Sequence, residues 1–211
     1  MPEDISSLRN DYIKQKLNKS DLFADPILQF KNWLLQAIDS KVYEPTAMTL
    51  ATSNLENKPS ARIVLLKFVN EDGFAFFTNY NSRKGIELTQ NPNAALVFYW
   101  PELERQVRVE GSVSKLGNQI SDEYFNSRPE QSRISAIVSP QSQPIPDREF
   151  LEKKVNEFIA SKNEIIRPDN WGGFILNPER IEFWQGRESR LHDRFLYEKS
   201  NKMWQIIRLA P

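Results

Sequence analysis

The segment from Trp184 to Arg194, WQGRESRLHDR, carries the densest group of residues that could do chemistry. If residues 190–194 are extended, side-chain alternation along a strand places Arg190, His192 and Arg194 on one face. Two guanidinium groups and an imidazole on one face repel one another unless an anion lies opposite them. For a single arginine, an exposed edge strand with surface ion pairs is the simpler explanation. Three such groups together, one of them the chain's only histidine, beside a tryptophan, favour an anion site.

A second basic group flanks the apolar run of residues 63–66, with Arg62 before it and Lys67 after it. Charges beside such a run are costly to bury unless they are paired. Within one regular strand over residues 60–69, their odd separation points the two side chains to opposite faces. The sequence therefore predicts contacts with two different anions, or a bulge that reorients one residue. Edge-strand charges that deter aggregation explain either residue taken alone.

A third basic group lies at the start of a short helix expected over residues 82–90, with Ser82 as its N-cap. Helix N-termini attract anions through free N–H groups and the helix dipole. Arg83 and Lys84 occupy the first turn, where acidic residues are normally favoured. This inversion indicates a phosphate site.

A fourth group combines a phenol, a guanidinium and a hydroxyl near another helix start. Tyr124 and Arg128 are four residues apart, so the sequence predicts that they share a helical face. Pro129 is expected to start the next helix, with Ser132 in its first turn. A second phosphate pocket fits this pattern, although tyrosine–arginine pairs at helical spacing often only pack.

The composition excludes several other kinds of site. The 211 residues include 28 basic and 28 acidic side chains, and a formal charge of zero argues against a general polyanion binder. The absence of cysteine removes disulfides and thiolate chemistry, and a single histidine rules out a multi-histidine metal site, so no metal is expected. The seven glycines form neither common phosphate-loop motif.

Some alternatives remain open at this point. A Ser-His-Asp triad is disfavoured because the predicted neighbours of His192 are cations. A pair of glycosidase-type carboxylates has no local support, yet it is not excluded. Aromatic and basic strands also bind single-stranded nucleic acid in small barrels, a reading that the zero net charge weakens. The charged N-terminus lacks a signal-peptide pattern, and no apolar run approaches the roughly 20 residues of a membrane span, so we expect a cytoplasmic protein.

These groups must be positioned by a fold that reads as α+β and mainly β. Asp25 and Pro26 are expected to open a helix that ends near Ser40 and buries a face made of Ile27, Phe30, Leu34, Ala37 and Ile38. A short polar helix is expected up to about residue 17. Further helices are expected over 82–90 and within 118–162, broken at Pro129 and at 139–146. Strands are expected over 47–53, 60–69, 74–78, 94–100, 105–116, 171–177, 180–186, 193–198 and 203–209.

This order of elements predicts one closed antiparallel sheet with flanking helices. We expect a single domain over residues 1–211, in which residues 1–20 form an N-terminal segment that either packs on the body or frays.

Several motifs, taken in order, resemble the pyridoxamine 5′-phosphate oxidase family. They are RIVLLK at residues 62–67, Thr78 with Ser82-Arg83-Lys84, and above all WQG…RLHDR at residues 184–194. The opening residues Leu8, Arg9 and Tyr12 and the ending RLAP agree as well. The similarity covers nearly the whole chain from about residue 8. RIVLLK alone is a weak signal, whereas its combination in order with RLHDR is highly specific.

This resemblance implies an FMN-binding split β-barrel and a homodimer with FMN at the interface. It implies that flavin contacts come from Arg62, Ile63, Val64, Leu65, Leu66, Lys67, Phe77, Thr78, Arg83, Lys84, Gln106, Gln141, Ser142, Trp184 and Arg194. The substrate would meet Arg9, Tyr12, Lys67, Tyr124, Arg128, Ser132, Arg190 and His192, of which Arg190 and His192 are the implied catalytic residues.

The implied reaction oxidises pyridoxamine or pyridoxine 5′-phosphate to pyridoxal 5′-phosphate, in vitamin B6 biosynthesis and salvage, with O2 as acceptor and H2O2 as product. A hydride leaves the substrate carbon for the flavin, while Arg190 and His192 orient the substrate. Neither nucleic acid nor membrane is an expected partner. The alternatives are a flavin reductase on the same fold and a non-catalytic barrel that binds flavin or nucleic acid, since a fold does not determine an activity.

Overall fold

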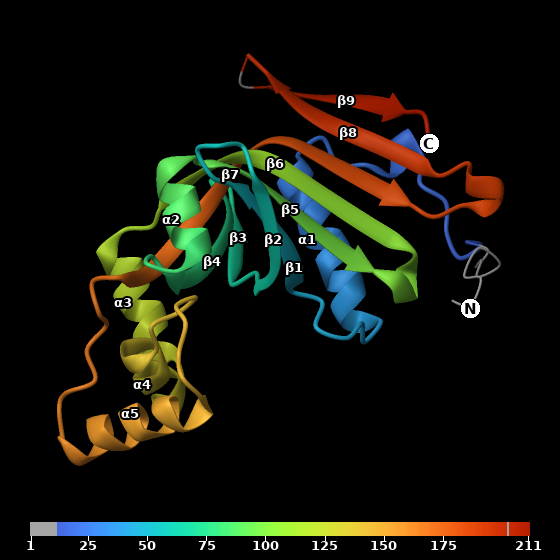
Figure 1. The fold of residues 1–211 in the computed structure, drawn as a ribbon. Coiled ribbons are helices and arrows are strands. Elements are labelled where there is room, and N and C mark those ends of the chain that lie inside the picture. Colours follow the sequence, from blue (N-terminus) through green and yellow to red (C-terminus); the bar gives the residue numbers. More distant parts are fainter. Residues whose placement is uncertain (1–11, 202) are drawn as a thin grey trace, which may run out of the picture.

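A computed structural model describes residues 12–201 and 203–211 (Figure 1). In this part of the chain nine strands form one antiparallel sheet in the order β2-β1-β5-β6-β7-β4-β3, with β8 on β7 and β9 on β8. The strands are β1 (Ala47–Ser53), β2 (Pro59–Leu65), β3 (Phe68–Asn70), β4 (Gly73–Asn79), β5 (Asn93–Trp100), β6 (Arg105–Lys115), β7 (Trp171–Gln185), β8 (Asp193–Ser200) and β9 (Met203–Leu209).

The helices divide into one that covers the core and a group at one end of the sheet. They are α1 (Pro26–Asp39), α2 (Arg83–Gln90), α3 (Asn118–Ser127), α4 (Glu130–Val138) and α5 (Arg148–Ala160), with short 3-10 turns at Lys19–Asp21, Pro101–Leu103 and Glu188–Arg190. Helix α1 lies against the curled sheet, whereas α3, α4 and α5 project from one end of it (Figure 1). None of the helices in the described part of the chain has the length and apolar character that a membrane crossing requires.

The connection between β2 and β3 brings the two edges of the curled sheet together. Only Leu66 and Lys67 separate the two strands. The Leu66 N–H donates to the Thr46 carbonyl beside β1, whereas the Lys67 N–H donates to the Ala75 carbonyl in β4. No hydrogen-bond ladder joins β2 to β3 among the described strands, so the barrel is split. The expected fold class, a mainly β split barrel with flanking helices on one antiparallel sheet, is confirmed, whereas the expected closure of the sheet is wrong because β2 and β3 do not pair.

Helix α1 begins and packs largely as its sequence predicts. The Asp25 carboxylate accepts a hydrogen bond from the Ile27 N–H at 2.8 Å, and Pro26 occupies the first helical position. Phe30 is fully buried, with its ring 4.8 Å from both Phe74 and Phe98. The predicted face is wrong at one position, since Ile38 is 48% exposed.

Four predicted elements are corrected by the structure. Residues 12–17 are not helical; they lie along the sheet, where the Leu17 N–H donates to Asp193. Residues 60–69 form two strands instead of one, and the segments 171–177 and 180–186 form the single strand β7. Residues 190–194 are not one extended face, because Arg190 ends a 3-10 turn with a φ of 60° and β8 begins only at Asp193.

The N-cap of α1 generates a stability prediction. Asp25→Ala removes the acceptor for the Ile27 N–H and should lower the free energy of unfolding by about 1 kcal/mol. Urea unfolding at one fixed protein concentration measures this loss. Asp39→Ala, at the other end of the same helix, is the matched control and should change the stability by less than about 0.5 kcal/mol. Equal losses in the two variants would contradict a capping role.

Candidate functional site

A cavity of about 480 Å³ opens where β2, β4, α2, the α3–α4 junction and the start of β7 meet. This volume lies within the roughly 300–1,000 Å³ typical of small-molecule sites. Eleven residues implied by the resemblance line it: Ile63, Val64, Leu65, Lys67, Phe77, Thr78, Lys84, Tyr124, Arg128, Ser132 and Gln141. The fold therefore brings together residues that are up to 78 positions apart, since the set runs from 63 to 141.

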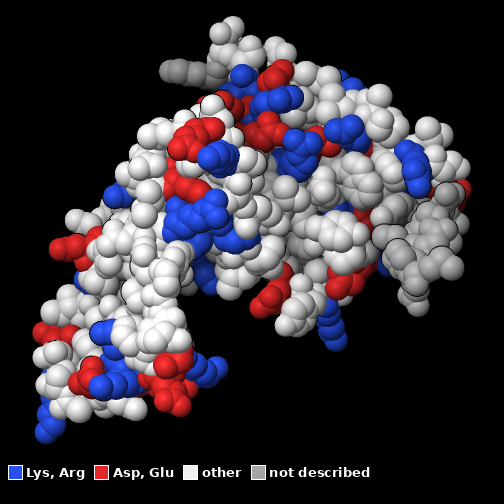
Figure 2. Space-filling model, viewed as in Figure 1, with Lys and Arg blue, Asp and Glu red and all other residues white. Residues whose placement is uncertain are grey.

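Three cations face this cavity without a carboxylate partner. Within the described residues, no acidic side chain lies at ion-pair distance from Lys67, Lys84 or Arg128. Figure 2 shows basic side chains gathered on the surface beside α2. Three unpaired cations around one cavity repel each other, and an anionic ligand would relieve that repulsion.

Arg128 gives the sharpest indication of an anion site. It follows the last residue of α3, and its guanidinium lies 4.8 Å from the centre of the Trp171 ring. Its Nη1 is buried and has no hydrogen-bond acceptor among the described residues. Burial lowers the pKa of Arg128, and the nearby Tyr124 partly opposes this effect. Leaving such a donor unsatisfied costs about 1–3 kcal/mol, so the geometry suits a ligand that accepts this hydrogen bond.

Two hydroxyl groups position the Lys84 ammonium within the described part of the chain. Its Nζ donates to Thr78 at 3.2 Å and to Ser82 at 3.4 Å. Ser82 is the N-cap of α2, as predicted, and its side chain accepts from the Gly85 N–H. Thr78 in turn donates to the Gln141 side chain, which fixes the loop after α4 to β4. Burial lowers the pKa of Lys84, and the charge of Arg62 lowers it further.

Aromatic rings form one wall of the cavity. Phe77 stacks on Tyr124 with a centroid separation of 4.0 Å and an interplanar angle of 25°. Trp171 continues the stack 5.6 Å from Phe77. Lys67 lies over the Tyr124 ring at 5.9 Å. A flat apolar wall beside cations suits a ligand that joins an aromatic ring to a phosphate.

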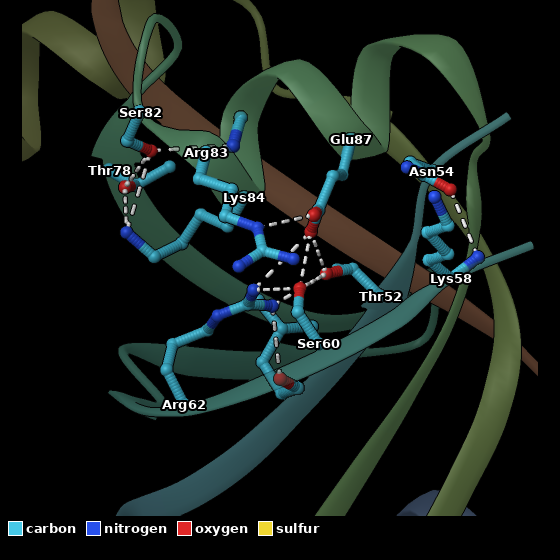
Figure 3. A network of polar contacts seen from close by, with 12 residues as sticks. Thr52, Asn54, Lys58, Ser60, Arg62, Thr78, Ser82, Arg83, Lys84 and Glu87 are labelled. Atoms are coloured by element: carbon cyan, nitrogen blue, oxygen red, sulfur yellow. Dashed lines mark hydrogen bonds and ion pairs between the residues drawn. The ribbon is translucent and has the colours of Figure 1, made fainter. Parts of the chain in front are cut away.

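Two implied flavin residues, Arg62 and Arg83, are not among those that line the cavity. Arg62 and Arg83 both contact the carboxylate of Glu87, which also accepts from Thr52 and Ser60 (Figure 3). The argument from odd spacing is wrong here, because β2 ends at Leu65, so Lys67 lies outside the strand. Leu66 is buried in the core, and Ser142 does not line the cavity.

The remaining implied residues form a second group at the far end of the sheet. Gln106, Trp184 and Arg194 lie directly opposite one another across β6, β7 and β8. Trp184 and Tyr12 contact the His192 ring, with centroids 4.6 Å and 5.6 Å away. None of these residues lines the cavity.

The His192 imidazole, which belongs to this second group of residues, is neutral and hydrogen-bonded. Its Nδ1 accepts from the Arg187 N–H at 3.1 Å, which places the ring proton of the neutral form on Nε2. Burial first, and then the charges of Arg190 and Arg194, lower the pKa of His192. Nε2–H is therefore the donor that His192 offers near neutral pH.

The arginines of this region differ in how many of their guanidinium donors are already hydrogen-bonded within the described residues. Arg194 donates through Nε and Nη2 to both oxygens of Glu182, and through Nη1 to the Ala210 carbonyl. Arg187, which has no predicted role, pairs with Asp193 at 2.9 Å. Arg190 is exposed on its turn. Arg9, an implied substrate contact, lies outside the described residues.

Strand β7 separates the two groups. Trp171 at its first position lines the cavity, whereas Trp184 near its last position belongs to the second group. Thirteen strand residues span roughly 40 Å along the chain. The two groups therefore lie at opposite ends of one strand.

Some cavity residues were missed in the sequence. Asn79, Pro129 and Trp171 line the cavity, and Trp171 also borders an adjoining cavity of about 450 Å³ with Gln131 and Ser135. One sequence signal could have pointed to Trp171. It is followed by the only Gly-Gly pair of the chain, and glycines inside a strand mark places where another part of the protein or a ligand approaches the backbone closely. A Cβ on Gly172 would lie 2.2 Å from the Tyr80 hydroxyl.

Comparison with known proteins agrees with the resemblance drawn from the motifs. Residues 34–162 match the family model described as pyridoxamine 5′-phosphate oxidase, and residues 171–211 match one described as the pyridoxine 5′-phosphate oxidase C-terminal dimerisation region. The pyridoxine/pyridoxamine 5′-phosphate oxidases of Leptospira interrogans and Nostoc punctiforme are 51% and 53% identical over 214 residues, covering all of both chains in each case.

Solved structures show the same fold. PhzG from Burkholderia lata, in complex with tetrahydrophenazine-1-carboxylic acid, superposes with a TM-score of 0.87 at 32% identity, covering 91% of this chain and 95% of that one. A pyridoxamine 5′-phosphate oxidase-related, FMN-binding protein of Nostoc punctiforme gives 0.72 at 20% identity, covering 90% and 100% of the two chains. With both family models matched in order and full-length relatives above 50% identity, the chain belongs to the pyridoxamine 5′-phosphate oxidase family.

Proposed function

We propose that this protein is an FMN-dependent oxidase that converts pyridoxamine 5′-phosphate or pyridoxine 5′-phosphate to pyridoxal 5′-phosphate, with O2 as acceptor and H2O2 as product. The observation that carries the proposal is the cavity in which Lys67, Lys84 and Arg128 lack a carboxylate partner among the described residues. The relatives that share more than half of the residues are named for this activity.

The residues present fit a flavin phosphate at one side of the cavity. Lys84 offers an ammonium group at the N-terminus of α2, close to the Thr78 and Ser82 hydroxyls. Arg83 adds a guanidinium that is 63% exposed. These donors suit a phosphate ester, and residues 63–65 border the same cavity.

A second set of lining residues fits the substrate phosphate. Arg128 has a buried Nη1 without an acceptor among the described residues, and Ser132 and Tyr124 supply hydroxyl groups to the same cavity. Lys67 lies above the Tyr124 ring at 5.9 Å. Two phosphates, one from the cofactor and one from the substrate, would satisfy both sets of cations.

The site is completed by a second subunit. The second group, at the other end of β7, contains Arg190, His192, Trp184, Gln106 and Arg194, and one chain does not bring it to its own cavity. A symmetric dimer repeats both groups, so the partner's second group can face this chain's cavity. The match of residues 171–211 to a dimerisation region supports this arrangement.

The protein residues bind and orient while the bound flavin supplies the redox chemistry, accepting two electrons from the substrate. Arg190 and the Nε2–H of His192 donate hydrogen bonds to the substrate ring and its oxygen, which fixes the reacting carbon. Lys67 and Arg128 anchor the phosphate. Water hydrolyses the imine that pyridoxamine 5′-phosphate yields.

The oxidase assay tests this function directly. The purified protein should be yellow, and addition of pyridoxamine 5′-phosphate in air should produce H2O2 and pyridoxal 5′-phosphate in equal amounts. Coupled peroxide detection and product absorbance measure the two. Yellow protein without peroxide would point to a reductase or a flavin carrier on this fold and would overturn the proposal.

Single substitutions should separate cofactor contacts from substrate contacts. Lys84→Ala or Arg83→Ala should weaken FMN binding roughly 10- to 100-fold, because each removes a charge-assisted hydrogen bond to the phosphate. Arg190→Ala should retain flavin and lower kcat/KM at least tenfold. Flavin titration and steady-state kinetics check this division, and equal flavin loss in all three variants would contradict it.

The two-subunit site predicts complementation. Lys84→Ala and Arg190→Ala chains, each with its own tag, form hybrid dimers on co-expression. In each hybrid, one of the two sites combines the native cavity of the Arg190→Ala chain with the native second group of the Lys84→Ala chain. An equal mixture should recover about a quarter of the wild-type activity, the fraction of sites expected from random pairing in a symmetric dimer. No recovery above the two single variants would place each site within one subunit.

A further inference from the structure

Glu87 is a buried carboxylate three residues after Lys84, which is one of the cavity cations. It lies on α2 and is 4% exposed. Its Oε2 accepts from the Thr52 hydroxyl of β1 at 2.5 Å and from the Ser60 hydroxyl of β2 at 2.6 Å. Its Oε1 accepts from Arg83 Nε at 2.8 Å. These donors come from three elements, so the carboxylate joins α2 to two strands (Figure 3).

The same carboxylate fixes Arg62 in place. Arg62 Nη1 donates to the Leu50 carbonyl and to Thr52, while Nη2 donates to Ser60 and contacts Glu87 at 3.3 Å. Its side chain is only 20% exposed. Arg62 is therefore held between β1 and α2, and its charge lies close to Lys84, whose pKa it helps to lower.

The Arg83 guanidinium is held through its Nε alone within the described residues. Its Nε is occupied by Glu87, whereas neither Nη group donates to an acceptor among the described residues. A guanidinium has a rigid planar fork, so fixing Nε also fixes the direction of the two Nη groups. With its side chain 63% exposed, Arg83 presents these groups outward at the N-terminus of α2, next to Lys84.

This arrangement is more than an ordinary pair on a helix surface. Arg148 and Glu152 on α5 have the same i, i+4 spacing and the same 2.8 Å distance, yet Glu152 is 58% exposed and has no other donor among the described residues. Glu87 has four donors around a buried carboxylate. Hydrogen bonds from Ser60, Thr52 and Arg83 outweigh the effect of burial and lower the pKa of Glu87 to about 2, so it stays charged at any working pH.

We propose that Glu87 is a positioning residue that orients Arg83 for the phosphate of the flavin, while Arg62 braces the carboxylate from the strand side. This inference rests on the proposed function, because it assigns a purpose to the cations of that site. Coulomb's law alone predicts the opposite effect, since a carboxylate beside a phosphate site repels the phosphate. Preorganised donors outweigh this repulsion when the side chains would otherwise have to be ordered on binding.

Glu87→Gln tests the proposal through flavin binding instead of turnover. The full-length chain, freed of flavin, is titrated with FMN and with riboflavin, which has the same ring system without the phosphate. We expect the Kd for FMN to rise about tenfold and the Kd for riboflavin to change less than twofold. Glu152→Gln, which removes the matched surface pair, should change neither constant.

Ser60→Ala is a milder second variant in case Glu87→Gln does not fold. It removes one donor to Glu87 and one acceptor for Arg62, and it should raise the FMN constant about threefold with riboflavin unchanged. Equal weakening of both flavins would reveal a merely structural role. Tighter FMN binding would show that the carboxylate acts only by repulsion. Either result overturns the inference, whereas a wild-type chain that binds no flavin overturns the proposed function itself.

Discussion

Strand β7 is the constraint on which the rest of the structure depends. Its 15 residues pair with β4 and β6 along their lengths and with β8 at its end. Because β7 is long, Trp171 at its start lies beside the cavity, whereas Trp184 near its end lies roughly 40 Å further along the chain. The two groups of implied functional residues are therefore kept apart within a subunit. This separation along the strand is the reason for proposing a site shared by two subunits.

Charge is distributed in two different ways across the molecule. Glu87, Glu182 and Asp193 are buried carboxylates that each contact two arginines, and these networks join strands and helices. Lys67, Lys84 and Arg128 have no such partner in the described part of the chain. Glu182 and Asp193 thus neutralise arginines that join strands, whereas Glu87 pairs with Arg62 and with only the Nε of Arg83. The cavity cations are left for a ligand. This division supports the proposed phosphate site, which has no glycine loop.

The site was predictable to the extent that it depends on local sequence. Ser82 capping α2, with Lys84 beside it, followed from the order of three adjacent residues, because capping is a local interaction. The geometry of Arg62 and Lys67 was predicted wrongly, since the β2–β3 break at residues 66–67 has no turn residue to mark it. Glu87 was missed because an acidic residue in the second turn of a helix is unremarkable until Thr52 and Ser60 are brought against it.

By itself, the sequence determined the type and order of nearly every element, the cationic groups and, through its motifs, the family. Hydrophobic periodicity, caps and turn residues act over a few positions, so they can be read along the chain. Only the tertiary structure decided which groups share a cavity, which arginines are neutralised by carboxylates, and that Arg190 lies on a turn instead of a strand face. These outcomes depend on contacts between residues far apart in the chain, where burial and charge are set by whichever neighbours the fold supplies.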